Sequence, residues 1–300
     1  MNAVELGATL YVPATNPVAI AMAYGSIDEL RSMVVCLEDA VRDDQVPEAI
    51  KGLKNLLAAL SDKPSDLSIY VRPRDLPMLS RLLQMDGIEH ITGFVLPKVT
   101  TQTLPVWLTV LMQSEHRIMP TIEGEEAFDR FALARMCDQL KPYAERVAAV
   151  RIGGNDILAL LGIRRSRYRT AYDGPLGAVI RDIAGTFIPN GFSVAAPVFE
   201  HFSSPDILRR EIEQDIEHGL LTKTAIHPDQ VPIIHSVYRP DAYEMAEARA
   251  ILSQDAPAVF GSNGSMCEPA THAPWAGQII KRAQIHGIAG PVEQACAMVA

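Results

Sequence analysis

Charged and polar side chains recur directly after short apolar stretches of this chain, where they could gather to do chemistry. They are Glu38, Asp39, Arg72, Arg74, Lys98, Glu123, Asn155, Asp156, His227, Asp229 and Gln230. Carboxylates that are brought close together repel one another unless they share a proton or a cation. Mg²⁺ is typically held by one or two carboxylates, and waters and substrate oxygens complete its coordination. The pattern therefore predicts a divalent-cation site, provided that the fold brings the ends of these stretches together.

The apolar stretches have the length and composition of buried β-strands. Each is continuously apolar at its centre, as expected of a strand that is covered on both faces. The expected strands are Ala8–Pro13, Met33–Leu37, Leu67–Arg72, Ile91–Leu96, Arg117–Ile122, Val147–Ile152, Phe192–Ala196 and Leu221–Ile226.

Helical patterns separate many of these strands. Residues Pro47–Leu60 place leucines and an isoleucine on one stripe, and Ser204 followed by Pro205 opens a second helix that Gly219 ends. Alternation of strands and helices implies parallel pairing, and eight such units favour a closed TIM (β/α)₈ barrel. Active residues of a barrel lie at the carboxyl ends of its strands, which would bring the charged residues together.

An open, doubly wound sheet is the alternative architecture. It would normally carry a glycine-rich phosphate loop after an early strand, whereas Pro13–Pro17 contains no glycine. We expect the barrel over residues 1–239 and a C-terminal helical extension over residues 240–300. The extension should contain helices at Asp241–Gln254 and Pro269–His286 and a loop at Phe260–Met266. It would pack on a neighbouring subunit or cover its own barrel.

The bulk composition narrows the class of protein. The 300 residues are 48% hydrophobic, and 27 basic against 36 acidic side chains give a net charge of −9. An acidic chain without a basic stretch has little electrostatic attraction to nucleic acid or to an anionic membrane. The four cysteines are scattered, which disfavours a zinc site and fits a reducing compartment. With no leader pattern and no apolar run of about 20 residues, we expect a cytoplasmic protein.

Seven short segments, taken in order, carry a resemblance to a known family. They are Leu10–Pro13 (LYVP), Cys36–Val41 (CLEDAV), Val71–Arg72 (VR), Val95–Lys98 (VLPK), Ile122–Glu123 (IE), Gly153–Asp156 (GGND) and Ala225–Gln230 (AIHPDQ). Together they resemble the HpcH/HpaI aldolase and citrate lyase beta-subunit family. The resemblance covers nearly the whole chain. Any one segment is weak, but seven in the right order make a chance match improbable.

The resemblance implies both a metal site and a reaction. Glu123 and Asp156 would bind Mg²⁺, with Mn²⁺ as the alternative metal. The enzyme would be a carbon–carbon lyase or aldolase that cleaves or condenses a small 2-oxo or 3-hydroxy carboxylic acid, or its acyl thioester. The metal and Arg72 would stabilise the enolate that forms when the bond breaks.

The resemblance also assigns roles to other residues. Arg72 would hold a substrate carboxylate and take part in catalysis, while Glu38 and Asp39 would orient it or transfer a proton. In the extension, Glu268 stands where the family has an aspartate that reaches an active site, often that of the adjacent subunit. The further substrate contacts would come from Pro120, Gly153 and Asn155.

Two departures from the family pattern concern thioester binding. Members that handle thioesters usually carry Arg-Ser where this chain has Gly7-Ala8, and a lysine shortly after the LEDAV segment, where this chain reads Arg42–Pro47. Coenzyme A or an acyl-carrier thioester is therefore an open question. Two other functions stay open: hydrolysis of an acyl thioester at the same site, and a non-catalytic metal-binding subunit or binding protein. The family resemblance implies a homo-oligomer, either a trimer or a hexamer.

Several of these residues also have plain structural interpretations. The carboxylates of Glu38 and Asp39 could simply stabilise the amino end of the following helix, where backbone N–H groups are exposed. Asp156 could cap the helix that it precedes. For His227, a structural role in the eighth-strand loop is favoured over that of a general base. Lys98 could form a salt bridge at the barrel rim.

Overall fold

The computed structural model describes residues 3–290, and its larger part is a barrel of eight parallel strands. Neighbouring strands follow the order β7-β6-β5-β4-β3-β2-β1-β8. A parallel bridge between Ala196 and Lys223 joins the two ends of this order, so the sheet closes on itself. The predicted TIM barrel is confirmed. The strands are β1 (Ala8–Pro13), β2 (Ser32–Cys36), β3 (Ser68–Arg72), β4 (Gly93–Leu96), β5 (Arg117–Ile122), β6 (Val150–Ile152), β7 (Val194–Ala195) and β8 (Lys223–Ala225).

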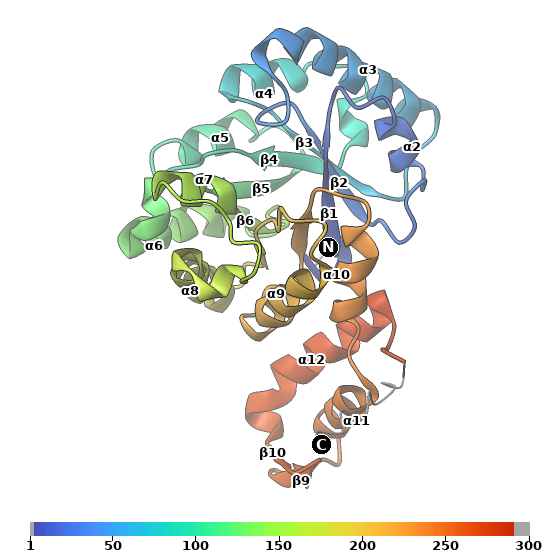
Figure 1. Ribbon diagram of the computed structural model, residues 1–300, viewed down its shortest axis with the longest axis vertical. Coiled ribbons are helices and arrows are strands. Elements are labelled where there is room, and N and C mark those ends of the chain that lie inside the picture. The colour runs from blue at the N-terminus through green and yellow to red at the C-terminus, as the bar shows by residue number, and fades with distance from the viewer. Residues whose placement is uncertain (1–2, 291–300) are drawn as a thin grey trace. The chain divides into compact units, whose positions relative to one another are not determined.

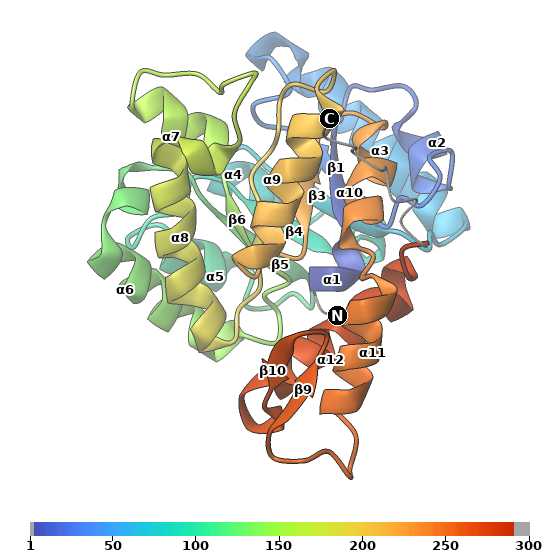
Figure 2. The same cartoon turned by 60° about the horizontal axis from the view of Figure 1, so that its bottom comes forward.

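Helices cover the outside of the barrel (Figure 1). In α3, Leu53, Leu57 and Leu60 are buried as its stripe predicts, whereas Ile50 of the same stripe is only half-buried. Figure 2 shows α8 and α9 side by side on the outer surface. The helices are α1 (Ala3–Leu6), α2 (Ala19–Ala23), α3 (Val46–Asp62), α4 (Leu76–Leu82), α5 (Leu104–Val110), α6 (Arg130–Leu140), α7 (Gly154–Leu160), α8 (Pro175–Phe187), α9 (Pro205–Glu217) and α10 (Gln230–Tyr238).

The interior of the barrel is packed with side chains rather than open. The buried cluster takes one or two residues from nearly every strand and its approach, and the half-buried Tyr11 packs against it. Its members are Leu6, Val34, Tyr70, Val95, Met119, Ala148, Ala149 and Ala195. Because side chains alternate along a strand, the residues two positions further on face the same interior. This layer therefore supports whatever lies above it at the carboxyl ends of the strands.

The second compact unit of the chain begins at His235, within α10. It contains α11 (Ala242–Ile251), β9 (Phe260–Ser262), β10 (Ser265–Cys267) and α12 (Pro269–His286). The loop that we expected at Phe260–Met266 is wrong, because this segment is an antiparallel hairpin. Asn263 and Gly264, both with positive φ, make its tight turn.

The remaining fold predictions concern the start of α9, membrane crossing and the domain limits. Ser204 occupies the N-cap position of α9 and Pro205 lies in its first turn, as expected, although the Ser204 side chain makes no capping hydrogen bond. No helix within residues 3–290 combines the length and the apolar composition that a membrane crossing needs. The domain limits at residues 239 and 240, and the packing of the extension, stay predictions.

Candidate active site

A cavity of about 410 Å³ opens at the carboxyl ends of the strands. Its walls come from β1, β2, β3, β5, β6, α7 and β8 and from the residues that follow them. Asp39, Arg72, Glu123, Asn155 and Asp156 all line this cavity. The structure thus brings together residues that are more than a hundred positions apart in the sequence.

Glu123 is the most deeply buried acid of the cavity, with only 3% of its surface exposed. Its Oε1 accepts hydrogen bonds from the backbone N–H of Lys98 at 2.7 Å and from Nη2 of Arg72 at 3.1 Å. Its Oε2 accepts no hydrogen bond from any residue between 3 and 290. One carboxylate oxygen is therefore fixed by the protein and the other is left for a ligand.

Asp156 is the second acid that lines the cavity, and no residue between 3 and 290 forms a hydrogen bond or an ion pair with its carboxylate. It lies in the first turn of α7, where Gly153 occupies the capping position, so Asp156 is not the helix cap that its sequence position also suggested. Burial raises the pKa of Glu123 to about 7; Arg72 opposes this rise and the charge of Asp156 adds to it. The two carboxylates thus repel each other across the cavity.

Arg72 connects three acids through a single nitrogen. Its Nη2 lies 2.8 Å from Glu38, 3.2 Å from Asp39 and 3.1 Å from Glu123. Burial lowers the pKa of Arg72, but the negative charge of Glu123 and its neighbours outweighs burial and raises it overall. Its Nε is buried and has no hydrogen-bond acceptor in the described part of the chain. Arg72 therefore stays cationic, and its ion pairs with the described acids all use Nη2.

Lys98 ties the same acids together from the end of β4. Its Nζ donates to Glu38 at 2.8 Å and to Asp39 at 3.2 Å, which matches the rim salt bridge considered for this residue. Burial and the hydrogen bond with Asp39 raise the pKa of Glu38, whereas the pKa of Asp39 is lowered, against its burial, by Glu38 and Arg72. Both acids lie before α3, whose capping position is Gln45. They therefore serve Arg72 and Lys98 rather than the helix end.

Known proteins match both the sequence and the fold of this chain. A family described as C–C bond lyases of the TIM-barrel fold matches residues 1–288. The chain belongs to this family. The L-malyl-CoA/beta-methylmalyl-CoA lyase of Cereibacter sphaeroides is 23% identical over 266 residues, which cover 81% of this chain and 82% of the relative. The citrate lyase subunit beta-like protein of Mycobacterium tuberculosis is 24% identical over 272 residues, covering 88% and 92%.

Solved structures share the fold of this C–C bond lyase family member. The M. tuberculosis protein CitE, in complex with magnesium, acetoacetate and coenzyme A, superposes with a TM-score of 0.69 at 22% identity, over 93% of this chain and 98% of that one. RipC from Yersinia pestis gives a TM-score of 0.61 at 19% identity, over 81% and 99%. The expected resemblance to citrate lyase beta subunits is confirmed.

The donor set of this family member fits a hard divalent cation. Within residues 3–290 no group of three or more His, Cys, Asp and Glu side chains is arranged to hold a metal. Two acids with free oxygens, Glu123 and Asp156, nevertheless share the cavity. Mg²⁺ is commonly bound in this way, by one or two carboxylates with the rest of its shell from water and substrate. The residues present therefore fit Mg²⁺ rather than a metal enclosed by protein ligands.

The other predicted contacts are distributed unevenly. Gly153 and Asn155 line the cavity, but Pro120 does not. Thr121 lines the cavity, and successive side chains of a strand point to opposite faces, so Pro120 faces away from it. The structure gives no support to a substrate contact by Pro120. Glu268 belongs to the second unit, where its carboxylate accepts a hydrogen bond from Thr271 at 2.9 Å. Its catalytic assignment stays a prediction.

The AIHPDQ segment has a structural explanation in this geometry. The side chain of Gln230 accepts the backbone N–H of Ile226 at 2.9 Å and donates to the carbonyl of Phe199 at 2.8 Å. The His227 ring stacks on Phe202, with 4.9 Å between ring centroids. These contacts hold the loop after β8, as the structural interpretation of His227 expects.

Sequence reasoning missed four residues that line the cavity from inside the barrel: Tyr11, Thr121, Arg151 and Thr224. All four lie within strands, whereas the active residues of a barrel are expected at the carboxyl ends of its strands. A signal was present for one of them, since Arg151 is a charged residue between Val150 and Ile152 in an otherwise apolar strand.

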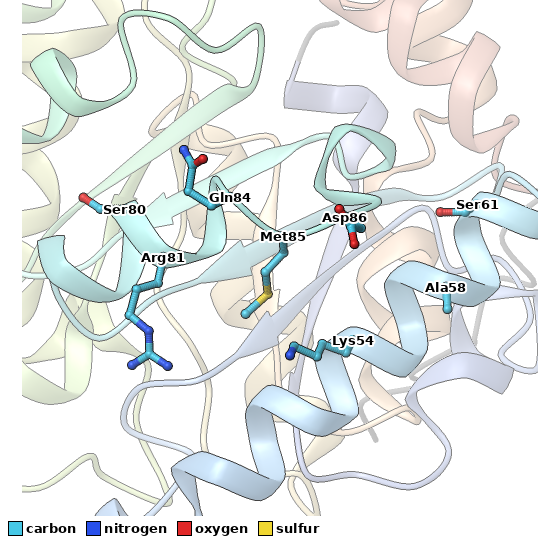
Figure 3. A pocket seen from close by; sticks show the side chains of 8 residues that line it. All are labelled: Lys54, Ala58, Ser61, Ser80, Arg81, Gln84, Met85 and Asp86. Atoms are coloured by element: carbon cyan, nitrogen blue, oxygen red, sulfur yellow. The ribbon is translucent and has the colours of Figure 1, made fainter.

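A second cavity, of about 730 Å³, lies on the outer surface of the barrel. Figure 3 shows Lys54, Ala58 and Ser61 of α3 on one side of it and the segment from Ser80 to Asp86 on the other. It lacks the converging acids of the first cavity, and the hydroxyls of both serines bond to carbonyls of their own helices. Its size alone does not make it the reaction site.

Proposed function

We propose that this protein is a Mg²⁺-dependent carbon–carbon lyase that acts on a small 2-oxo or 3-hydroxy carboxylic acid. The observation that carries the proposal is the pair of acids with unpaired oxygens, Glu123 and Asp156, in a cavity that Arg72 also lines. Family membership supports the reaction class, and relatives of known structure bind magnesium with acetoacetate or oxaloacetate.

The protein contributes a cation that is fixed before substrate arrives. Three acids hold Arg72 through Nη2, so its remaining donors can meet a substrate carboxylate without a cost in side-chain ordering. Bound Mg²⁺ would supply Lewis-acid stabilisation of the negative oxygen that forms as the carbon–carbon bond breaks. Arg72 would stabilise the same developing charge from its own position.

Asp39 is the proposed proton-transfer group of the site. It lines the cavity and is half-exposed at its side chain, whereas Glu38 is buried and does not line that cavity. Glu38 would act as a positioning residue that holds Arg72 and Lys98. The two neighbouring acids thus have separate roles, which their different environments support.

The backbone near β1 favours a free acid over a thioester as substrate. Gly7 has a φ of +56°, in the region that favours glycine. Its carbonyl accepts hydrogen bonds from the Thr222 hydroxyl at 2.7 Å and the backbone N–H of Lys223 at 3.1 Å. An arginine at this position, as thioester-handling relatives are expected to have, would strain the turn. Thioester hydrolysis remains the second candidate reaction of the site.

Calorimetry tests the metal site directly. Oxalate should bind the wild-type protein only in the presence of Mg²⁺. Glu123→Gln and Asp156→Asn should each weaken this binding by at least about tenfold, because each removes a charged ligand. Glu125→Gln is the matched control, since Glu125 is exposed two residues further along the chain. Equal binding by all variants would refute the site.

Turnover decides among the three functions. Purified protein with Mg²⁺ would be assayed against oxaloacetate and against malyl and citramalyl thioesters, following 2-oxo acid and free thiol separately. Release of a 2-oxo acid is expected; release of thiol alone would indicate the hydrolase. Mg²⁺-dependent oxalate binding without any turnover would instead indicate a non-catalytic binding protein.

We also propose a cytoplasmic homo-oligomer in which Glu268 acts in catalysis. Sedimentation would test the assembly, and the kinetics of Glu268→Gln would test the role of Glu268.

A further inference from the structure

Arg151 is a buried cation at the bottom of the cavity that the proposed chemistry does not use. It lies in the centre of β6, is only 2% exposed and lines the cavity. Its Nη2 donates to the hydroxyl of Thr224 at 2.5 Å and its Nη1 contacts the sulfur of Met119 at 3.4 Å. Its guanidinium carbon lies 5.2 Å from the ring centroid of Tyr11. The side chain therefore spans the barrel interior from β6 to β8, β5 and β1.

None of these neighbours carries a negative charge. No Asp or Glu side chain between residues 3 and 290 forms an ion pair with Arg151. By contrast, the buried Arg72 pairs with three acids and the buried Arg165 with Glu211. Burying a guanidinium without a counter-charge is costly, because the ion loses its hydration and gains only weak acceptors. A buried, uncompensated guanidinium that lines a cavity therefore indicates that an anion binds there.

A second unsatisfied group lies next to Arg151. Thr121 of β5 is directly paired with Arg151 in the parallel register. Its hydroxyl is buried and has no hydrogen-bond partner in the described chain, although Thr121 lines the same cavity. Two residues further along each strand lie Glu123 and Gly153. Arg151 and Thr121 therefore form a layer directly below the proposed metal ligand.

We infer that Arg151 binds a second carboxylate of the substrate, which makes the substrate a small dicarboxylic acid. The inference rests on the proposed function and names the substrate class of that same site. One carboxylate or oxo group would lie at the rim with Glu123 and Arg72, and the other would point down to Arg151 and the Thr121 hydroxyl. A carboxylate suits this position better than a phosphate, because one cation flanked by neutral hydroxyls balances a single negative charge.

The size of the cavity fits this assignment. A volume of about 410 Å³ is at the small end of ligand sites, and the Tyr11 ring covers one side of the guanidinium. Arg151 is then a specificity-determining residue. It would favour a diacid over the monoacid of the same shape, since a monoacid places a methyl group against an unpaired buried charge.

A matched pair of ligands tests the inference. L-malate and L-2-hydroxybutyrate differ only in the distal group, which is a carboxylate in the first and a methyl in the second. Calorimetry with the full-length protein and saturating MgCl₂ should show at least about tenfold tighter binding of L-malate, as expected for a hydrogen-bonded charge pair. Arg151→Met should abolish this preference by weakening the binding of L-malate, and it should not weaken the binding of L-2-hydroxybutyrate, because the methyl group no longer faces an unpaired charge.

Second variants keep the test informative if Arg151→Met does not fold. Thr121→Val should reduce the preference for L-malate and Thr121→Ser should restore it, because only the serine retains the hydroxyl. Mg²⁺-dependent binding of both ligands without a preference, or a preference that survives in Arg151→Met, would overturn the inference and leave the lyase proposal standing. Failure of the wild type to bind either ligand in a Mg²⁺-dependent manner would overturn both.

Discussion

Replacing Gly153 by alanine should disable the site by steric force alone. A Cβ at this position would lie 2.2 Å from Oε2 and 2.3 Å from Cβ of Glu123. The second contact cannot be relieved by rotating the carboxylate, because Cβ is attached directly to the backbone that follows β5. Gly153→Ala must therefore either separate the ends of β5 and β6 or turn the Glu123 side chain away from the cavity.

The size of the effect follows from this overlap. Overpacking of this kind typically costs about 1–3 kcal/mol, which for a domain of this size lowers Tm by several degrees. Displacing Glu123 also removes a charged ligand, so oxalate binding in the presence of Mg²⁺ should weaken by about tenfold or more. Differential scanning fluorimetry and calorimetry on the same preparation would measure the two consequences.

Gly124→Ala provides the matched control. Gly124 is the residue next to Glu123 and has a negative φ of −98°, and a Cβ added there would meet no atom within 4 Å. This variant should melt and bind like the wild type. If Gly153→Ala behaved like Gly124→Ala in both assays, the Glu123 carboxylate would not occupy the space above Gly153, and the geometry proposed for the site would be wrong.

Other predictions concern charge. Because burial raises the pKa of Glu123 to about 7 from its ordinary 4.5, the folded protein in EDTA binds a proton that the unfolded chain releases between these values. The free energy of unfolding should therefore fall as pH rises from about 4.5 to 7, by up to roughly 3 kcal/mol. When it is measured by urea unfolding at several pH values, it should depend less on pH in Glu123→Gln than in the wild type. Lys223→Met would leave the fully buried Asp215, which accepts from Nζ at 2.7 Å, without a cation, and would leave Glu211, which accepts from Nζ at 3.0 Å, with Arg165 alone. A loss of about 3–5 kcal/mol is expected in the same assay. Arg164→Ala removes an ion pair from a side chain that is 78% exposed and should cost less than about 1 kcal/mol.

The strands could be predicted because a parallel barrel buries both faces of each one. Two of the expected ranges, Ala8–Pro13 and Arg117–Ile122, match the observed strands fully. The range Val147–Ile152 is too long because Val147 forms only an isolated bridge with Ile118 before β6 begins. Apolar residues that approach a strand are buried like the strand itself, so hydrophobicity cannot show where the ladder starts.

The site could be predicted only in part. Residues at strand ends, such as Glu123 and Asp156, were found because a barrel places its chemistry there. Arg151 was missed because the same rule directs attention away from the middle of a strand. The hairpin turn at Asn263 and Gly264 was also missed, although Asn-Gly between two short strands is a strong turn signal. A helix-rich surrounding sequence obscured it.

Lys98 shows how much of the site is fixed in advance. It is not a glycine, yet its φ is +50°, a conformation that costs a side chain about 1–2 kcal/mol. Glycine would relieve this strain, and the backbone N–H would still reach Glu123 at 2.7 Å, but the ammonium that bridges Glu38 and Asp39 would be lost. The strain is thus explained by the need for both contacts from one residue. Lys98 and Arg72 together hold three acids in place, whereas Asp156 has no such partner among the described residues. The cation that we propose would offset the mutual repulsion of Asp156 and Glu123 in the shared cavity.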